Sequence, residues 1–97
     1  MSVTLTINNQ LTLLHDLLDE QNIARNGSTA EYQQIGRIVK SIMGKSNITD
    51  EQLLQLLPEI YNYGKQGENA QDTPEHIIAN KENINNWISA IQATNLE

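Results

Sequence analysis

Apolar residues recur along the chain at the spacing of an α-helix, in four separate stretches. In the first stretch they follow one another at alternating intervals of four and three, which places them on one stripe of a helix over about residues 7–23. The stripe consists of Ile7, Leu11, Leu14 and Leu18, with Leu17 beside it. The acidic residues of this segment fall on the opposite side, where water can solvate them.

The second and third stretches each begin with the pattern of a capping box. Ser28 with Glu31 predicts a helix over 29–43, which Gly44 ends, and Thr49 with Gln52 predicts one over 49–63. The apolar positions are Tyr32, Ile35, Val39 and Ile42 in the second helix, and Leu53, Leu54, Leu57, Ile60 and Tyr61 in the third. Pro58 interrupts the third helix and predicts a kink or break there, because its ring clashes with the preceding turn.

The fourth stretch follows a segment with two glycines and almost no apolar residues. This segment, 64–72, predicts the longest loop of the chain. Thr73 as N-cap and Pro74 at the first helical position then predict a helix over 73–93. Its stripe consists of Ile77, Ile84, Ile88 and Ile91, with Trp87 adjacent.

Four amphipathic helices with short polar connections can bury their stripes together only by packing on one another. The pattern therefore predicts an all-α fold, a small antiparallel bundle of four helices forming a single domain over residues 1–97. Leu96-Glu97 resembles a cloning scar, which would not contribute to the fold. Nothing in the pattern predicts the oligomeric state.

The composition excludes several kinds of functional site. No cysteine occurs, which excludes disulfides, thiolate metal sites and a catalytic cysteine. The N-terminal residues do not resemble a secretion signal, and no run of about 18 apolar residues occurs. We therefore expect a cytoplasmic protein without a membrane partner.

Few residues suggest a catalytic or metal site. His15 with Asp19, or Asp16 with Glu20, could face one side of a helix, but no second motif completes a set of metal ligands. His76 lies near acidic residues without a nucleophile that it could activate. Gly44-Lys45-Ser46 imitates the end of a phosphate-binding loop, but Val39 stands where that loop needs a glycine. We expect no metal, no cofactor and no enzymatic activity.

Charge is distributed unevenly along the chain. The net charge of −6 makes nucleic acid an unlikely partner. Arg37 and Lys40, with Lys45 after them, nevertheless form a local basic patch on the second helix, which could bind an anionic partner or complement the helix dipole.

The aromatic residues suggest a second surface. Tyr61 and Trp87 are expected in the core, because the chain contains no Phe. Tyr63, beside the predicted loop, is expected to be exposed. Together with Lys65 and His76 it forms the candidate surface for a protein partner, since loops on rigid scaffolds often carry binding residues.

Several short runs of the sequence resemble the YtzH-like family of small bacterial proteins. They are Leu14-His15-Asp16-Leu17-Leu18, Gly27-Ser28, Glu31-Tyr32-Gln33-Gln34, Ile38-Val39-Lys40-Ser41-Ile42-Met43, Ile60-Tyr61-Asn62-Tyr63-Gly64 and His76-Ile77. Some members of that family carry cysteines where this chain has Arg25-Asn26, so a thiol or metal role could not be shared here. The resemblance implies a cytoplasmic protein of Gram-positive bacteria and assigns it no activity.

These observations favour a non-enzymatic helical module that binds another protein. Two alternatives remain open at this point. One is a small-ligand-binding protein or minor enzyme with a pocket between the third and fourth helices, with His76 and Tyr63 at its rim. The other is binding of an anionic partner by the basic patch of the second helix, which predicts strong salt dependence.

Overall fold

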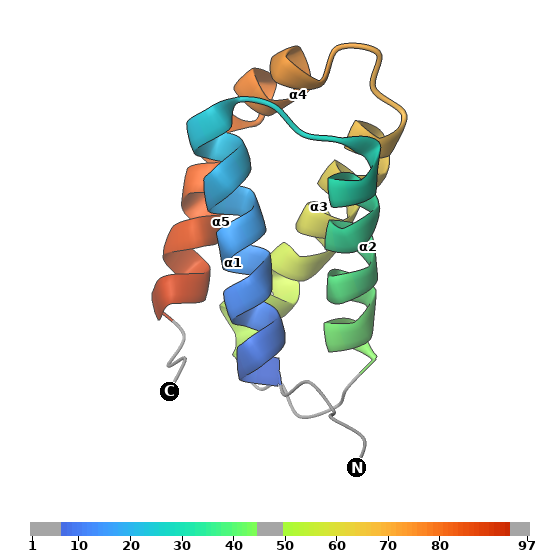
Figure 1. Ribbon diagram of the computed structural model, residues 1–97. Helices are drawn as coiled ribbons and strands as arrows, with labels where there is room; N and C mark the ends of the chain where they lie inside the picture. Colours follow the sequence, from blue (N-terminus) through green and yellow to red (C-terminus); the bar gives the residue numbers. More distant parts are fainter. Residues whose placement is uncertain (1–6, 45–49, 94–97) are drawn as a thin grey trace.

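The computed structural model describes residues 7–44 and 50–93, and every regular element within them is a helix (Figure 1). The helices are α1 (Ile7–Ala24), α2 (Thr29–Met43), α3 (Glu51–Glu68), α4 (Thr73–Ala79) and α5 (Lys81–Ala93). The all-α prediction is confirmed. The described residues form five helices rather than the four predicted, because the segment 73–93 is divided in two.

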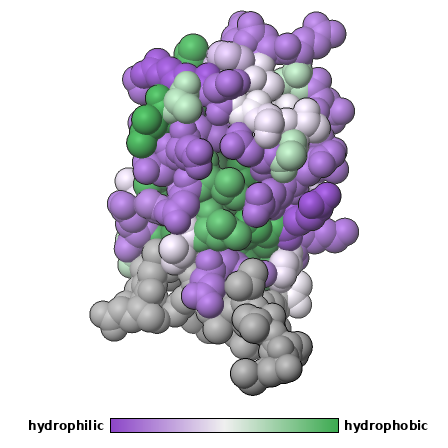
Figure 2. Space-filling model, in the orientation of Figure 1, coloured by the Kyte–Doolittle hydropathy of each residue, from purple (hydrophilic) through white to green (hydrophobic). Residues whose placement is uncertain are grey.

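Four long helices run alternately up and down, and α4 lies across one end of them (Figure 1). The α2 helix packs against α3, and α1 packs against α5. Polar side chains join α1 to α5: Asn22 donates to the side chain of Asn85 at 3.0 Å, and the side chains of Gln92 and His15 meet at 3.1 Å. On the face seen in Figure 2, apolar side chains gather in the middle and are surrounded by hydrophilic ones.

One continuous core lies inside the bundle, and most of the predicted stripes supply it. Its members are Leu11, Leu14, Leu18, Tyr32, Ile35, Ile38, Val39, Ile42, Leu53, Leu57, Ile60, Tyr63, Ile77, Ile84, Trp87 and Ile91. Among the described positions of the predicted stripes, Leu54 has 45% of its surface exposed, and Leu17, Tyr61 and Ile88 are partly buried against the core. The helical period therefore identified the buried faces.

Side chains cap the starts of α2, α3 and α4, although only one of the caps is the residue predicted. Ser28 and Glu31 form the predicted capping box of α2. The side chain of Asp50 caps α3 by accepting from Leu53 N at 3.1 Å, while Thr49 lies outside the described residues. Asp72 rather than Thr73 caps α4, accepting from Glu75 N at 3.0 Å. Carboxylates serve well here because they also favour the positive end of the helix dipole.

The third helix is longer than predicted, and of the kink or break predicted at Pro58 the break is absent, since α3 is continuous from Glu51 to Glu68. It runs on to Glu68 through both glycines of the predicted loop, so the connection to α4 spans only residues 69–72. Pro58 itself is exposed, whereas the neighbouring Leu57 and Ile60 are fully buried. Burial of these side chains holds the turn in place despite the missing hydrogen bond.

The two glycines within α3 allow α2 to approach closely. A Cβ atom on Gly64 would lie 3.1 Å from the carbonyl oxygen of Tyr32, and one on Gly67 would overlap the ring of Tyr32. The predicted loop was too long, because these glycines serve helix packing rather than a turn.

The predicted fourth helix is interrupted at Asn80. The side chain of Asn80 donates to the carbonyl oxygen of His76 at 2.9 Å, which ends α4, and its own carbonyl accepts from Ile84 N at 2.8 Å, within the first turn of α5. The side-chain amide thus adds a second donor to the carbonyl that the backbone N–H of Asn80 also reaches, at 3.2 Å, and the chain changes direction there (Figure 1).

Candidate functional site

Tyr63 lies in the core, which contradicts the prediction that it is exposed. Only 2% of its surface is accessible. Its ring stacks on His76 at 4.8 Å between centroids and meets Tyr32 and Trp87 edge-on at 5.6 and 5.4 Å. The position is covered because α3 continues beyond it. The predicted surface of Tyr63, Lys65 and His76 therefore does not exist as one exposed patch.

Hydrogen bonds fix this aromatic cluster. The Tyr63 hydroxyl donates to Oε1 of Gln21 at 2.7 Å, and Nε2 of His76 lies 3.1 Å from the carbonyl oxygen of Tyr63. Since a carbonyl can only accept, His76 carries its proton on Nε2. Burial raises the pKa of Tyr63 and of Tyr32 above the usual tyrosine value, which keeps both phenols neutral. The aromatic cluster therefore has a structural role in the core.

A hollow of about 410 Å³ lies on the α3 side of α4 and α5, where the pocket alternative placed a ligand. Its lining residues are Glu59, Asn62, Tyr63, Gln66, Asn80, Asn83 and Trp87. His76 is not one of them. The carboxylate of Glu59 accepts from the indole N–H of Trp87 at 3.2 Å, and both aromatic rings are buried. The hollow therefore offers mainly side-chain amides to a ligand.

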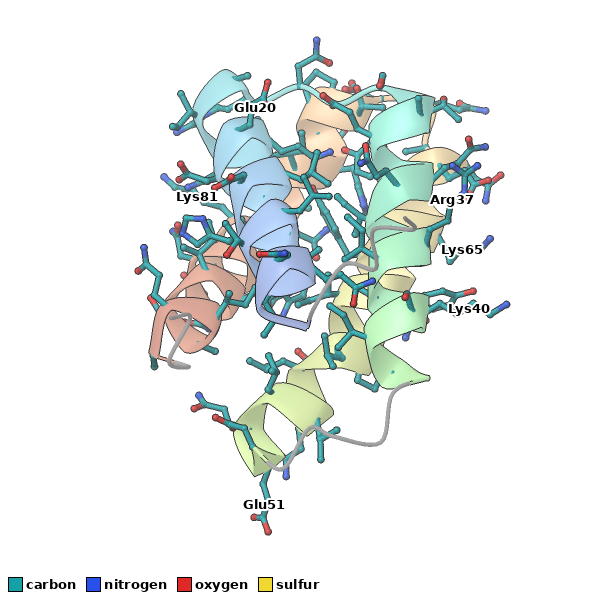
Figure 3. The ribbon with its side chains drawn as sticks, turned by 60° about the horizontal axis from the view of Figure 1, so that its bottom comes forward. Glu20, Arg37, Lys40, Glu51, Lys65 and Lys81 are labelled. Atoms are coloured by element: carbon teal, nitrogen blue, oxygen red, sulfur yellow. The ribbon has the colours of Figure 1, made fainter. Side chains whose placement is uncertain are left out.

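The other predicted binding residues meet on a different surface, between α2 and α3. A groove of about 270 Å³ runs there, and we call it the α2–α3 groove. It is lined by Gln33, Gly36, Arg37, Lys40, Tyr61, Lys65 and Glu68. Arg37 and Lys40 come from α2 and Lys65 from α3, and all three point to the same side of the molecule (Figure 3).

Among the described residues, the charged side chains on the α3 wall of the groove are paired, whereas those on the α2 wall are not. Glu68 lies 3.4 Å from the ammonium of Lys65 and accepts from the amide of Gln33 at 3.2 Å, which links α3 to α2. Within residues 7–44 and 50–93, neither Arg37 nor Lys40 forms an ion pair. The groove thus contains three cations and one carboxylate, and that carboxylate is already engaged.

Tyr61 and Gly36 lie between these walls. Tyr61 is half-buried and its hydroxyl has no hydrogen-bond partner among the described residues. A Cβ atom on Gly36 would lie 3.9 Å from the ring of Tyr61, which is an ordinary contact. Glycine inside a helix costs about 1 kcal/mol relative to alanine. Packing does not require Gly36, in contrast to Gly64.

Sequence reasoning missed three groove residues, Gly36, Gln33 and Glu68, and assigned Tyr61 to the core. A glycine within a segment otherwise favourable to helix was the available signal for Gly36. Trp87, assigned to the core with Tyr61, is indeed buried.

The remaining candidates are arranged as ordinary surface groups. His15 contacts Asp16 at 3.2 Å and Gln92 at 3.1 Å, so both ring nitrogens have partners. The part of the chain that the structure describes contains no group of three or more His, Asp or Glu residues able to hold a metal ion. Lys45 and Ser46 lie outside the described residues.

Comparison with known proteins agrees with the resemblance seen in the sequence. No solved structure matches the chain. The protein named "Uncharacterized protein YtzH" from Bacillus subtilis (strain 168) is 26% identical over 84 residues, which cover 87% of this chain and 90% of that protein. In the described residues, no helix is long and apolar enough to cross a membrane. The family model for "YtzH-like protein" matches residues 5–91, and the chain therefore belongs to the YtzH-like family.

Proposed function

We propose that this chain is a non-enzymatic, cytoplasmic binding module that holds a negatively charged group of its partner in the α2–α3 groove. One observation carries the proposal. Three of the six lysines and arginines of a chain with net charge −6 line a single groove, and they come from two helices (Figure 3). A local cationic site on an acidic molecule attracts anions selectively.

Helix stability alone does not account for these three cations. Lys40 and Lys65 lie in the last turns of their helices, where a positive charge complements the helix dipole. Arg37 lies farther from the end of α2, and it has no acidic partner among the described residues. Like charges on neighbouring turns repel, at about 0.2–0.5 kcal/mol per pair. An anion between the walls would remove this repulsion.

The lining residues also support a binding role over a catalytic one. They include no serine, threonine, cysteine or histidine that could serve as a nucleophile or a neutral base. Their single carboxylate, on Glu68, is held by Lys65 and Gln33. What the groove offers a partner is charge, amide hydrogen bonds and one aromatic ring.

A titration with inorganic pyrophosphate, followed by the backbone amide signals in NMR, tests the proposal. At low salt we expect the largest shifts at Gly36, Arg37 and Tyr61, and a weaker response near physiological ionic strength because exposed charges are screened there. The double variant Arg37→Glu/Lys40→Glu should lose the response.

The matched control is Arg25→Glu/Lys81→Glu, which changes the net charge equally but alters two exposed residues outside the groove. It should retain groove binding. Equal loss in both double variants, or shifts scattered over the whole surface, would show that pyrophosphate responds only to overall charge, and the proposal would be wrong.

A further inference from the structure

Side chains bridge the α2–α3 groove at one end. Glu68 bridges the walls there, through the 3.2 Å hydrogen bond from Gln33 and the 3.4 Å ion pair with Lys65. From Gln33 to Lys40 the α2 wall extends only about 10 Å, because a helix rises about 1.5 Å per residue. An extended peptide or nucleic-acid strand would have to pass this bridge, whereas a compact ligand would not.

The size of the groove agrees with a compact ligand. Its volume of about 270 Å³ is close to the lower end of the range for small-molecule sites, about 300–1,000 Å³. It combines two kinds of recognition. Arg37, Lys40 and Lys65 can surround one highly charged anion, and arginine can hold two phosphate oxygens at once.

Tyr61 adds a flat apolar surface next to these cations. Its ring is half-buried against the core, and beside it lies Gly36, which is itself buried and lines the groove without a side chain. Packing leaves room for a Cβ at this position, so the space belongs to the groove. Aromatic side chains of this kind stack on nucleobases.

We propose that the groove binds a mononucleotide, with the phosphate among Arg37, Lys40 and Lys65 and the base on Tyr61 over Gly36. This inference rests on the proposed function, because it names the anion that the groove selects. The phosphate supplies a counter-charge for Arg37 and Lys40, which form no ion pair among the described residues, beside Lys65, which Glu68 already pairs. The base covers the exposed part of the tyrosine ring.

The test compares nucleoside 5′-monophosphates with ribose 5-phosphate, which carries the same phosphate and sugar without a base. Isothermal titration calorimetry at low salt gives each affinity, and NMR locates the binding. We expect at least one of the adenosine, guanosine, cytidine and uridine monophosphates to bind about tenfold or more tightly than ribose 5-phosphate, as stacking of a base on an aromatic ring allows.

Three variants separate the parts of the site. Tyr61→Leu should remove the preference for nucleotides and leave ribose 5-phosphate affinity unchanged, whereas Tyr61→Phe should retain the preference. Gly36→Ala, which fits the packing, should weaken nucleotide binding without loss of helicity. Arg37→Gln should weaken nucleotides and ribose 5-phosphate alike.

Two results would overturn the inference. Equal affinity for nucleotides and ribose 5-phosphate would remove the base from the site while leaving anion binding by the groove intact. A nucleotide preference that survives Tyr61→Leu would place the base elsewhere. If neither pyrophosphate nor any of these phosphates binds, the proposed function fails together with the inference.

Discussion

The hydroxyl of Tyr63 donates a 2.7 Å hydrogen bond to the side-chain oxygen of Gln21, and so joins α3 to α1 across 42 positions of the chain. Both residues are almost completely buried. This bond lies in the middle of the aromatic cluster, where no solvent can replace either partner. Tyr63 is therefore a structural residue, and loss of its hydroxyl should weaken the fold.

Tyr63→Phe should destabilise the protein by about 1–3 kcal/mol, because it leaves the buried oxygen of Gln21 without its donor. Urea unfolding followed by circular dichroism measures this change. Tyr32→Phe is the matched control, since the Tyr32 hydroxyl is buried without a hydrogen-bond partner among the described residues. Its removal should leave the stability unchanged or raise it. A larger loss in Tyr32→Phe than in Tyr63→Phe would contradict this account of the cluster.

Alkaline pH should unfold the protein. Burial raises the pKa of Tyr63 and Tyr32 above the ordinary tyrosine value of 10.0, so the folded state holds these protons more tightly than the unfolded state. The stability they contribute is complete below about pH 10 and falls as the pH rises further. Urea midpoints measured on both sides of that pH, together with tyrosinate absorbance, would show ionisation of the buried phenols coinciding with unfolding. Reversible ionisation of all three tyrosines in a protein that stays folded would disprove it.

Substitution of glycine by alanine should have opposite effects at two positions. Gly64→Ala should destabilise the protein, because the new methyl group would press on the α2 backbone at 3.1 Å. Gly36→Ala should stabilise it by up to about 1 kcal/mol, because alanine favours helix and the nearest atom is 3.9 Å away. Thermal unfolding of the two variants distinguishes these effects. The same sign at both positions would contradict the described packing of α2 on α3.

Pro58→Ala should raise the free energy of unfolding by up to about 3 kcal/mol, since it restores a backbone donor in the interior of α3. Pro58 is exposed, so the substitution leaves no cavity. Pro74→Ala is the control, because Pro74 lies in the first turn of α4, where its missing N–H is harmless. An equal response of the two prolines to substitution would be evidence against a continuous α3.

The sequence predicted the buried faces well, because a helix that buries one side must repeat its apolar residues at the helical period. Its glycines were harder to interpret. The segment that contains Gly64 and Gly67 has the composition of a loop. The two glycines instead allow a close approach to Tyr32, which lies far away in the chain. The sequence did not indicate that the helix ends at Asn80, since that end depends on a hydrogen bond from the Asn80 side chain to the carbonyl oxygen of His76.

The sequence likewise predicted only part of the groove. Arg37 and Lys40 were recognised as a basic patch from their spacing on one helix. Lys65 was assigned to a different surface with Tyr63, because the third helix was expected to end before it. Its place beside Arg37 and Lys40 follows from the continuation of α3 past Gly64, which single-helix periodicity cannot foresee.

The pairing of α1 with α5 has a consequence for the order of folding. The α2 and α3 helices follow each other in the chain, so their contact closes a short loop, whereas α1 and α5 meet only after the intervening chain has been arranged. We therefore expect the α2–α3 hairpin to form early and the seam at Asn22 and Asn85 to close last. On hydrogen exchange, the amides of α1 and α5 should open first, and the hairpin that carries the groove should remain protected the longest.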